Sequence, residues 1–569
     1  MPGVYYPLTR QRAIIKPPTH EVYIVPSDDS TCYGVQVASQ FEVLSPEQTV
    51  QFITACSRGT WIISYDTIWI TTLFSDHLDI ITRAETVGEY QNTIIETKYT
   101  KVFIVDLFQA TNDTIWKASR KLGVEISPIE QDINQHLKTK IAAVCNIWYK
   151  YQDAVNVAWE VFPSKTTGAT ALKAWRATIP DKTEYKVRGS RVNKLARNAI
   201  RPGVLNWREG YYPQGYAYDI NGSYIHAMRT VKLPTSFVCF INRPPYDRWI
   251  ATVKLNYKSN LQWGVLPIKA NTGQLYRPTE ITNFITTITY LDLYLLQMTG
   301  KVEIVQWLEG ITWQPKDEGY LFNTWIDGLV QASKETDYKY LLKNISRSLH
   351  SKFAQAADGK SLMLIQPKTK EETLEYAARK ELKDIIITAK GNVILQIEKP
   401  YAMQFIPFYF PAWEALILAT GRLQLYTAVN QNTIYVDTDS IISTTPRQDL
   451  SLSTELGAWK QEAEGHTAII SPRGYLCGSK FRCSGIRATS AKQLKEAILS
   501  AAQGIETDVE KIEYGNLIRQ TKTEVKNHTV KIEKYPAVVL HNNTFYVTRS
   551  PTIEVQAIIH KRLFSLDIE

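Results

Sequence analysis

The sequence predicts an α+β protein of several domains. Its 569 residues are 44% hydrophobic and 21% charged, which is typical of folded globular proteins and excludes disordered, collagen-like and coiled-coil chains. At roughly 150 residues per domain the length suggests about four domains. Short β-forming runs alternate with turns from 21 to about 100, and helical spacing follows from about 112 to 162. This order predicts an α/β domain, and the rest of the chain mixes helices and strands.

Composition and charge favour a chain that stays inside the cell and meets a polyanion. The formal charge is +9, and aromatic residues make up 11%; a mildly basic surface suits a polyanionic partner. The six cysteines form no C-x-x-C pair, so we expect reduced thiols and no zinc site. The N-terminus lacks the apolar core of a signal peptide. The most apolar window, 401–420, is interrupted by prolines, so we expect no membrane span.

The first 200 residues divide into three segments. Residues 1–20 are Pro-rich and basic and are interpreted as an arm, and residues 21–185 as the α/β domain. Six lysines and arginines, without one acid, follow between 186 and 201. This basic segment is either a solvated linker or a track that binds phosphates between two domains.

The strongest local pattern is TIYVDTDSIIST at 433–444. Two β-forming runs flank Asp437-Thr438-Asp439, which predicts a tight hairpin with acids at its tip. Because residues i and i+2 of a strand point to the same side, Asp437 and Asp439 are expected to face one point. Two such carboxylates repel each other unless a cation lies between them, and Mg²⁺ takes oxygen ligands of this kind. The alternative is an ordinary polar turn.

A further acid ends the β-like run YAYDI. Asp219 precedes the turn Asn221-Gly222-Ser223. If this strand end met the hairpin tip, the three acids would form a carboxylate cage for two metal ions, as in enzymes of phosphoryl transfer. Taken alone, an acid at a strand end is more often a simple cap.

Residues 338–355 predict a helix with a cationic face. Apolar residues recur at helical spacing and predict a buried face. Lys339, Lys343 and Arg347 recur every four residues without acidic partners. Like charges at this spacing repel each other, so the pattern suits a polyphosphate lying along the helix. The alternative is a solvated helix face.

Taken in chain order, the three segments resemble the polymerase motifs of family B DNA polymerases. The similarity is greatest to the protein-primed branch of small bacteriophages, adenoviruses and linear plasmids. The family patterns D-x-x-S-L-Y-P, K-x-x-x-N-S-x-Y-G and Y-x-D-T-D-S resemble residues 219–225, 343–351 and 435–440. Residues 200–203 resemble the family's Y-x-G-G, and 473–475 its K-x-Y. The second motif departs from the pattern, with Arg347 for Asn, His350 for Tyr and Ser351 for Gly.

The resemblance implies an RNase H-like exonuclease-type domain followed by a right-hand polymerase with palm, fingers and thumb. The implied division is 1–20 arm, 21–185 exonuclease-like domain, 186–240 linker and start of the palm, 241–330 palm insertion resembling the terminal-protein region, 331–400 fingers with an insertion of the strand-displacement type, 401–490 palm, and 491–569 thumb.

The resemblance also implies the site residues of a DNA-directed DNA polymerase. The catalytic and metal-binding residues would be Asp219, Asp437 and Asp439. Residues for the incoming nucleotide would be Tyr224, Lys339, Lys343, Arg347 and His350. Residues for primer and template would be Arg201, Gly203, Arg473 and Tyr475. Two Mg²⁺ ions, for which Mn²⁺ could substitute, are the implied cofactors.

The exonuclease-type motifs are incomplete. The first motif should supply an acid where the chain has Pro26-Ser27, although Asp28 follows and could stand in. Asp66 resembles the second motif, and Tyr149 with Asp153 the third. Because a two-metal exonuclease needs acids from three elements, we predict a weak or absent 3′→5′ activity. Two other readings stay open: a silent polymerase relative that only binds nucleic acid, and a nuclease.

The implied partners are template and primer DNA, deoxynucleoside triphosphates and a terminal protein that supplies the first hydroxyl. No membrane partner is expected. The implied location is the host cytoplasm or a replication compartment of the host cell, and secretion is not expected.

Overall fold

The computed structural model describes most of residues 20–483. Within that range it leaves out 29–30, 66–72, 74–82, 87–93, 97–99, 125–131, 181–182, 184, 186–188, 202, 270–274, 356–359, 366–374, 376–381, 388–392, 401–407 and 472; outside it, only 18, 495, 498–499, 537–541 and 544–548 are described. The chain forms two compact units. The first contains 1–189, 232–236 and 319–414, and the second 190–231, 237–318 and 415–569.

The first unit is built on a mixed β-sheet. The N-terminal strands of this sheet lie in the order β3-β2-β1-β4-β7. They are β1 (Glu21–Pro26), β2 (Tyr33–Val37), β3 (Gln40–Leu44), β4 (Trp61–Ser64) and β7 (Lys101–Asp106). Strands β1, β2 and β3 are antiparallel neighbours, while β1, β4 and β7 run parallel. Alternating apolar residues of β1, β4 and β7 fill the core together with α2.

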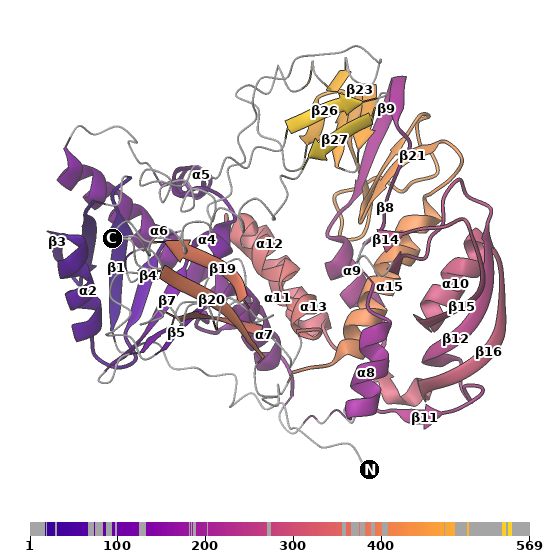
Figure 1. The fold of residues 1–569 in the computed structure, drawn as a ribbon, viewed down its shortest axis with the longest axis horizontal. Helices are drawn as coiled ribbons and strands as arrows, with labels where there is room; N and C mark the ends of the chain where they lie inside the picture. Colours follow the sequence, from indigo (N-terminus) through magenta and orange to yellow (C-terminus); the bar gives the residue numbers. More distant parts are fainter. Residues whose placement is uncertain are drawn as a thin grey trace. The chain divides into compact units, whose positions relative to one another are not determined.

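Strands from far along the chain extend this sheet to ten (Figure 1). Beyond β7 the order continues β6-β5-β18-β20-β19, with β5 (Arg83–Thr86), β6 (Ile94–Glu96), β18 (Lys360–Ile365), β19 (Leu382–Ile387) and β20 (Val393–Pro400). Strand β18 pairs with β5, antiparallel, at Leu362–Thr86 and Met363–Glu85. Part of the segment expected to be a fingers insertion therefore completes the sheet of the N-terminal domain.

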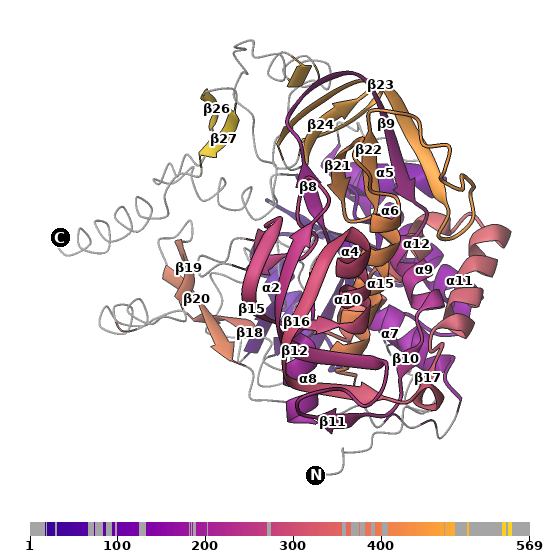
Figure 2. The same cartoon turned by 90° about the vertical axis from the view of Figure 1, so that its right-hand side faces the viewer.

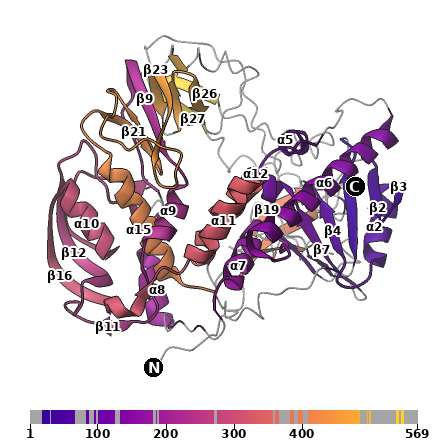
Figure 3. The same cartoon turned by 180° about the vertical axis from the view of Figure 1, so that it is seen from behind.

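The helices of the first unit pack on this sheet or on one another. They are α2 (Pro46–Ala55), α4 (Phe108–Thr111), α5 (Ile115–Lys121), α6 (Ile133–Trp159), α7 (Thr167–Ala177), α11 (Asn323–Glu335), α12 (Lys339–Arg347) and α13 (Leu349–Lys352). Helix α6 packs on β1 and β2, as Figure 3 shows from behind. The aromatic rings of Trp159 and Trp325 stack with centroids 5.3 Å apart, which fastens α11 to α6. The helices expected for the fingers thus belong to the same unit as the N-terminal domain.

The second unit contains an antiparallel sheet of seven strands. Its order is β25-β24-β23-β9-β22-β21-β8, with β8 (Leu205–Trp207), β9 (Gly210–Ile220), β21 (Thr433–Asp437), β22 (Ser440–Ser443), β23 (Trp459–Ser471), β24 (Gly474–Cys477) and β25 (Lys480–Cys483). Strand β9 lies in the middle, between β22 and β23. Residues of the first, third and later motifs therefore come together although they are far apart in the chain.

A four-stranded sheet and further helices also belong to the second unit (Figure 2). The sheet order β11-β16-β12-β15 comprises β11 (Val238–Phe240), β12 (Arg248–Ser259), β15 (Glu280–Thr289) and β16 (Gly300–Trp313). Helix α10 (Tyr290–Thr299) packs on this sheet, as does α8 (Ser190–Asn198), and α9 (Ser223–Thr230) follows β9. The alternating burial of β12 provides one apolar face for the core.

The remaining elements belong to neither of these groups. They are β10 (Leu233–Pro234), β13 (Ile268–Lys269), β14 (Leu275–Tyr276), the 3₁₀ turn Pro315–Asp317, β17 (Glu318–Gly319), α15 (Pro411–Thr427), β26 (Ala537–His541) and β27 (Thr544–Thr548). Most of the predicted thumb, 491–569, lies outside the described residues. Of the helices within the described part, none is long and apolar enough to cross a membrane.

Candidate active site

The acidic hairpin predicted from the sequence is present in the second unit. Strands β21 and β22 pair up to Asp437–Ser440, so Thr438 and Asp439 form the two-residue turn. Thr438 adopts a left-handed φ of 58°, which is unfavourable for a β-branched residue. Its N–H donates to the Val204 carbonyl at 2.7 Å, and a Cβ added to Gly203 would come within 2.5 Å of its hydroxyl. Gly203 therefore allows the chain to support this strained turn closely.

Asp219 lies beside the turn, on β9. It is the register partner of Ser440, and the N–H of Ile220 donates to the Asp439 carbonyl at 2.8 Å. The sheet order β9-β22-β21 thus brings two acids of different motifs to one sheet end. Local sequence patterns singled out both acids, and the pairing of β9 with β22 brings Asp219 next to Asp439.

The electrostatics of these acids suit a cation. Burial, and after it the neighbouring charges of Asp439 and Glu462, raise the pKa of Asp219 to about 7. Like charges held together in this way are relieved by a bound cation. No group of three or more His, Cys, Asp or Glu suited to a metal occurs among the described residues. A pair of carboxylates is nonetheless a donor set that Mg²⁺ uses when substrate phosphates supply further oxygens.

Asp437 is arranged differently from Asp439. Its carboxylate is 3.3 Å from Arg473 Nε and 3.4 Å from Arg482 Nη1, and the residue is only 5% exposed. The expectation that strand alternation aims both acids at one point is wrong in its reasoning, because Asp439 belongs to the turn and not to the strand. Asp437 instead orders two arginines at the edge of the site.

The K-x-Y-like segment supports this arrangement. Arg473 has a left-handed φ of 59°, and its N–H donates to the Tyr435 hydroxyl at 3.1 Å. Tyr475 is buried, with its ring centroid 4.8 Å from that of Tyr435. Arg473, whose side chain is 45% exposed, remains able to meet a phosphate, whereas the buried Tyr475 acts here through packing.

Two functional candidates were missed by sequence reasoning. Glu462 on β23 contributes to the field at Asp219, and Lys480 on β25 forms an ion pair with Glu462. Lys480 places one cation beside the acids, and its pKa is raised because Glu462, Tyr475 and Asp219 outweigh its burial. The sequence signal was the charge alternation in WKQEAE, but a register shift between Gln461 and Ala463 interrupts the strand at Glu462, so simple alternation does not give its position.

Tyr224 lies on α9, directly after the strand that carries Asp219. Its ring would contact a Cβ added to Gly421 of α15 at 3.5 Å. The glycine at 421 therefore leaves room for the ring. The sequence had placed a bulky ring next to Asp219, and the structure puts α15 against that ring.

Arg201 is buried, contrary to its expected role at the template. It is 6% exposed, with Nη1 3.8 Å from Asp292 and Nη2 2.6 Å from the Thr286 hydroxyl. Arg422 binds the same Asp292 at 2.7 Å and also the Arg201 carbonyl. Burial lowers the pKa of Arg201 to about 10, against the opposing effect of Asp292. This network ties α10 and α15 to the 201–204 segment, so Arg201 has a structural position.

Within the basic segment, helix α8 carries Arg191, Lys194 and Arg197 on exposed positions. Arg191 forms an ion pair with Glu309 of β16. Lys186 and Arg188 lie outside the described residues.

The nucleotide-binding residues expected on the second motif lie in the first unit. Lys339, Lys343 and Arg347 are exposed along α12, while Leu342 and Ile345 are buried. His350 Nδ1 is 3.0 Å from a carboxylate oxygen of Glu414, and both side chains are largely buried. The departure from the family's Tyr is thus matched by an acid that fixes the imidazole, a partner that sequence reasoning did not name.

Of the exonuclease-type candidates that the structure describes, Asp28 and Asp153 lie apart. Asp28 follows β1 and forms an ion pair with Lys140 of α6, whose Nζ also donates to the Pro26 carbonyl at 3.2 Å. Hydrogen bonding to Lys140 lowers the pKa of Asp28, against its burial, and His136 adds to the effect. The Lys140 ammonium therefore lies beside Asp28. A metal-binding carboxylate would instead have a free metal ion at that position.

Asp153 lies in the C-terminal part of the same helix, α6. It is thirteen positions beyond Lys140 in α6, which is about 20 Å at 1.5 Å per residue. The Asp153 carboxylate accepts a hydrogen bond from the Tyr338 hydroxyl, and Tyr149 is 57% exposed. Asp28, beside Lys140, and Asp153 therefore lie at separate positions along α6, and the weak or absent 3′→5′ activity stays a prediction. Asp66 lies outside the described residues.

The family model described as DNA polymerase type B, organellar and viral, matches residues 76–432. No curated protein matches. Among solved structures, the orthorhombic form of phi29 DNA polymerase matches at TM-score 0.69 and 15% identity, over 85% of this chain and 95% of that one.

Two complexes of the same phi29 enzyme give similar agreement. The complex with primer-template DNA matches at TM-score 0.67 and 14% identity, over 94% of this chain and 99% of that one. The complex with primer-template DNA and incoming nucleotide matches at TM-score 0.64 and 15% identity, over 84% and 94%. The α+β fold, an RNase H-like exonuclease-type domain followed by a right-hand polymerase, is thereby confirmed.

Proposed function

The chain belongs to the organellar and viral type B DNA polymerases, and from this premise we propose that it is a template-directed, protein-primed replicase with a two-metal palm. The observation that carries the proposal is the meeting of Asp219 and Asp439 at one sheet end, with the pKa of Asp219 raised to about 7 by its burial and by the neighbouring acids. A palm that had lost its function would have no need to keep this repulsion.

The reaction is nucleotidyl transfer. The oxygen of a primer hydroxyl attacks the α-phosphorus of a deoxynucleoside triphosphate, a new P–O bond forms, and the bond to the β-phosphate oxygen breaks. Pyrophosphate leaves, and the hydroxyl proton goes to water. Bound Mg²⁺ would supply charge stabilisation to the attacking and leaving oxygens.

Asp219 and Asp439 would hold Mg²⁺, with Mn²⁺ as a substitute. Asp437 keeps Arg473 and Arg482 in order, so that Arg473 can contact the primer phosphate. Tyr224 would lie under the deoxyribose, where its ring leaves no room for a 2′-hydroxyl.

The triphosphate would be bound by the cationic stripe of α12, which we define as Lys339, Lys343 and Arg347. These cations recur every four residues, and no acid of the same helix lies between them. A solvated helix face usually mixes both charges, so the stripe is better suited to binding a chain of phosphates. His350, fixed by Glu414, would stack on the nascent base pair with less area than a tyrosine. Two further template contacts are expected. One is at Gly203, which lies against the turn residue Thr438, and the other is along α8.

Protein priming is proposed from the motif pattern of the branch and from chain coverage. The fold of phi29 polymerase is matched over 99% of that chain, which supports the proposal at the level of the fold. The four-stranded sheet of 237–318 would receive the terminal protein, and 356–400 would support strand displacement. At initiation the hydroxyl would come from a side chain of that protein.

The experiment that tests the proposal is primer extension on a primed single strand with Mg²⁺ and dNTPs. Extension that requires all four dNTPs and follows the template is expected. A second reaction replaces the primer by candidate terminal proteins, and labelled nucleotide linked to the protein is expected. Tight DNA binding without extension would show a silent relative instead.

A further inference from the structure

Helix α12 has a second face, beside the cationic stripe, that contacts the exonuclease-like domain. Lys339, Lys343 and Arg347 are exposed, while Tyr340 and Asn344 form the adjacent i, i+4 stripe and are half-buried. Residues with this spacing lie above one another on a helix. How α12 is held therefore decides where its cations point.

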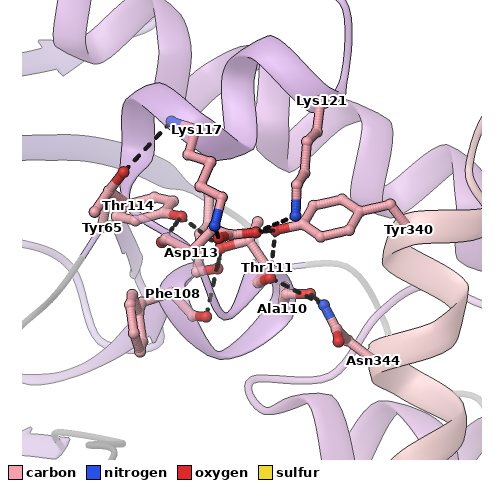
Figure 4. Close-up of polar contacts among 11 residues, drawn as sticks. Tyr65, Phe108, Ala110, Thr111, Asp113, Thr114, Lys117, Lys121, Tyr340 and Asn344 are labelled. Carbon is pink, nitrogen blue, oxygen red and sulfur yellow. Dashed lines mark hydrogen bonds and ion pairs between the residues drawn. The ribbon is translucent and has the colours of Figure 1, made fainter. Parts of the chain in front are cut away.

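Asn344 and Tyr340 contact the end of α4 (Figure 4). The Asn344 Nδ2 lies 3.0 Å from the carbonyl oxygens of both Ala110 and Thr111. The last carbonyls of a helix have no partner within the helix, so the amide satisfies groups that would otherwise need water. The Tyr340 hydroxyl is within hydrogen-bond distance of the Thr111 carbonyl and lies 2.6 Å from Asp113 Oδ2.

The acceptor Asp113 is itself held by two lysines. Lys117 and Lys121 of α5 are 2.8 and 2.7 Å from its two carboxylate oxygens. Burial alone would raise the pKa of Asp113, but the hydrogen bonds from these lysines and from Tyr340 outweigh it and lower the pKa to about 2. The Lys121 ammonium also lies 4.5 Å from the centroid of the Tyr340 ring. The carboxylate is therefore charged and fixed at working pH.

A separate contact holds the start of α12. The Tyr338 hydroxyl donates to Asp153 Oδ2 on α6, and Lys150 lies 6.0 Å from the centroid of the Tyr338 ring. Asp153 is the acid that the motif pattern assigned to an exonuclease. In the structure its carboxylate serves a helix that carries nucleotide-binding cations.

We propose that the exonuclease-like domain acts as a cradle for α12, in which Tyr338, Tyr340 and Asn344 are positioning residues for dNTP binding and Asp153 and Asp113 are their acceptors. The inference rests on the proposed polymerase function. Without the cradle, α12 must be ordered when the triphosphate binds, and that ordering weakens binding. The chemical step itself, carried by the palm acids, changes less.

The test uses full-length protein and single-nucleotide incorporation on a primed template, with KM for the dNTP and kcat measured separately. Asp153→Ala and Tyr338→Phe each remove one hydrogen bond, and each should raise KM about threefold to tenfold. The pair Tyr340→Phe with Asn344→Ala should raise KM at least about tenfold. The matched control Tyr320→Phe removes an exposed hydroxyl from the same unit and should leave KM unchanged.

Asp153→Asn is the discriminating variant. The amide oxygen introduced at position 153 can still accept the hydrogen bond from Tyr338, so the cradle predicts a KM close to that of the wild-type protein. If Asp153 acted as a metal ligand instead, the same substitution would remove the charge that it needs. The double variant Asp153→Ala, Tyr338→Phe should be no worse than either single variant, because both remove the same bond. Hydrogen exchange in α12, with α7 as the reference, should be faster than in the wild-type protein for Asp153→Ala and for Tyr338→Phe but not for Asp153→Asn. This readout does not depend on kcat.

Two outcomes are decisive and distinct. Wild-type protein that does not extend a primer would overturn the proposed function and the cradle with it. Wild-type protein that extends normally, while Asp153→Ala and Tyr338→Phe keep both the wild-type KM and the wild-type exchange rate of α12, would overturn the cradle alone.

Discussion

Carboxylates of the two units are in opposite electrostatic situations. In the seven-stranded sheet, burial and the neighbouring acids Asp439 and Glu462 raise the pKa of Asp219 to about 7. In the exonuclease-like domain, Asp28 and Asp113 have lowered pKa values, because lysines on α6 and α5 lie against them and outweigh their burial.

The palm acids have excess negative charge that a bound cation would neutralise, whereas Asp28 and Asp113 are already neutralised by lysines of the protein. Acids placed beside acids destabilise the free protein and are relieved by binding. Acids neutralised by an internal lysine have no such need. The contrast points to nucleotidyl transfer in the palm and to a structural role for the acids described in the N-terminal domain.

The largest effect expected from this contrast is in the palm. Asp219→Asn and Asp439→Asn should each reduce primer extension on the order of 10³-fold or more, since loss of one ligand charge disturbs the metal site. DNA binding, measured by gel shift, should stay within about twofold, because phosphate contacts persist. The exposed Asp247→Asn serves as control. Normal extension by either palm variant would end the assignment.

The second prediction concerns proofreading. Degradation of a labelled single strand with Mg²⁺ or Mn²⁺, and without dNTPs, should be at least about a hundredfold slower than extension, since acids from three elements are required and Asp28 is paired with Lys140. We would abandon this view if rapid 3′→5′ digestion disappeared in an Asp66→Ala, Asp153→Ala double variant but persisted in Asp219→Asn.

A third prediction separates shape from charge within the palm. Tyr224→Ala should raise ribonucleotide incorporation roughly 10- to 100-fold, because a bulky ring no longer excludes the 2′-hydroxyl. Tyr224→Phe keeps the ring and should discriminate like wild type. The ratio of kcat/KM for dNTP and rNTP measures the effect, and an unchanged ratio in the Ala variant would make Tyr224 a core residue.

The fourth prediction follows from the raised pKa of Asp219. Folding favours its protonated form, so stability from this group is present below the unfolded pKa near 4 and is lost as pH rises towards 7. In EDTA at pH 8, Asp219→Asn should therefore be more stable than wild type by roughly 1–2 kcal/mol, and the two should converge near pH 4. Urea denaturation at both pH values provides the measurement. A destabilised Asn variant at pH 8 would contradict the repulsion.

The smallest effect is expected at the internal lysine. Lys140→Met should destabilise the protein by about 1 kcal/mol, because Asp28 is exposed enough for solvent to screen the pair. The lowered pKa of Asp28 means that this contribution is present above its unfolded pKa near 4 and fades as pH falls through the lower folded value. Lys138→Met, on the exposed side of α6, is the control. Equal stability of the two variants at pH 7 would show that the ion pair contributes nothing.

Local sequence patterns predicted the palm better than the N-terminal domain. The DTD hairpin and Asp219 were found because turn residues and β-forming runs are local signals. Arg201 was misjudged, since its partners Asp292 and Arg422 come from distant elements. Charge patterns alone do not tell a phosphate-binding arginine from a buried one.

The contact made by Asp153 could not be predicted, for a related reason. A Y-x-x-x-D spacing fits many helices, and only the packing of α12 on α6 shows what its carboxylate contacts. Glu462 was missed because a single acid in an alternating strand has no distinctive neighbours. Long-range pairing, such as β18 with β5, leaves no trace in local periodicity.

That strand pairing has a consequence for synthesis. When β5 leaves the ribosome its far side is an open sheet edge, and the strand that covers it, β18, emerges much later, with Met363 opposite Glu85. At usual translation rates the delay is on the order of tens of seconds. An uncovered edge is prone to pair with other chains. We therefore expect nascent chains truncated before 360 to aggregate or recruit chaperones, and soluble expression to depend on a slow, late closure of the sheet.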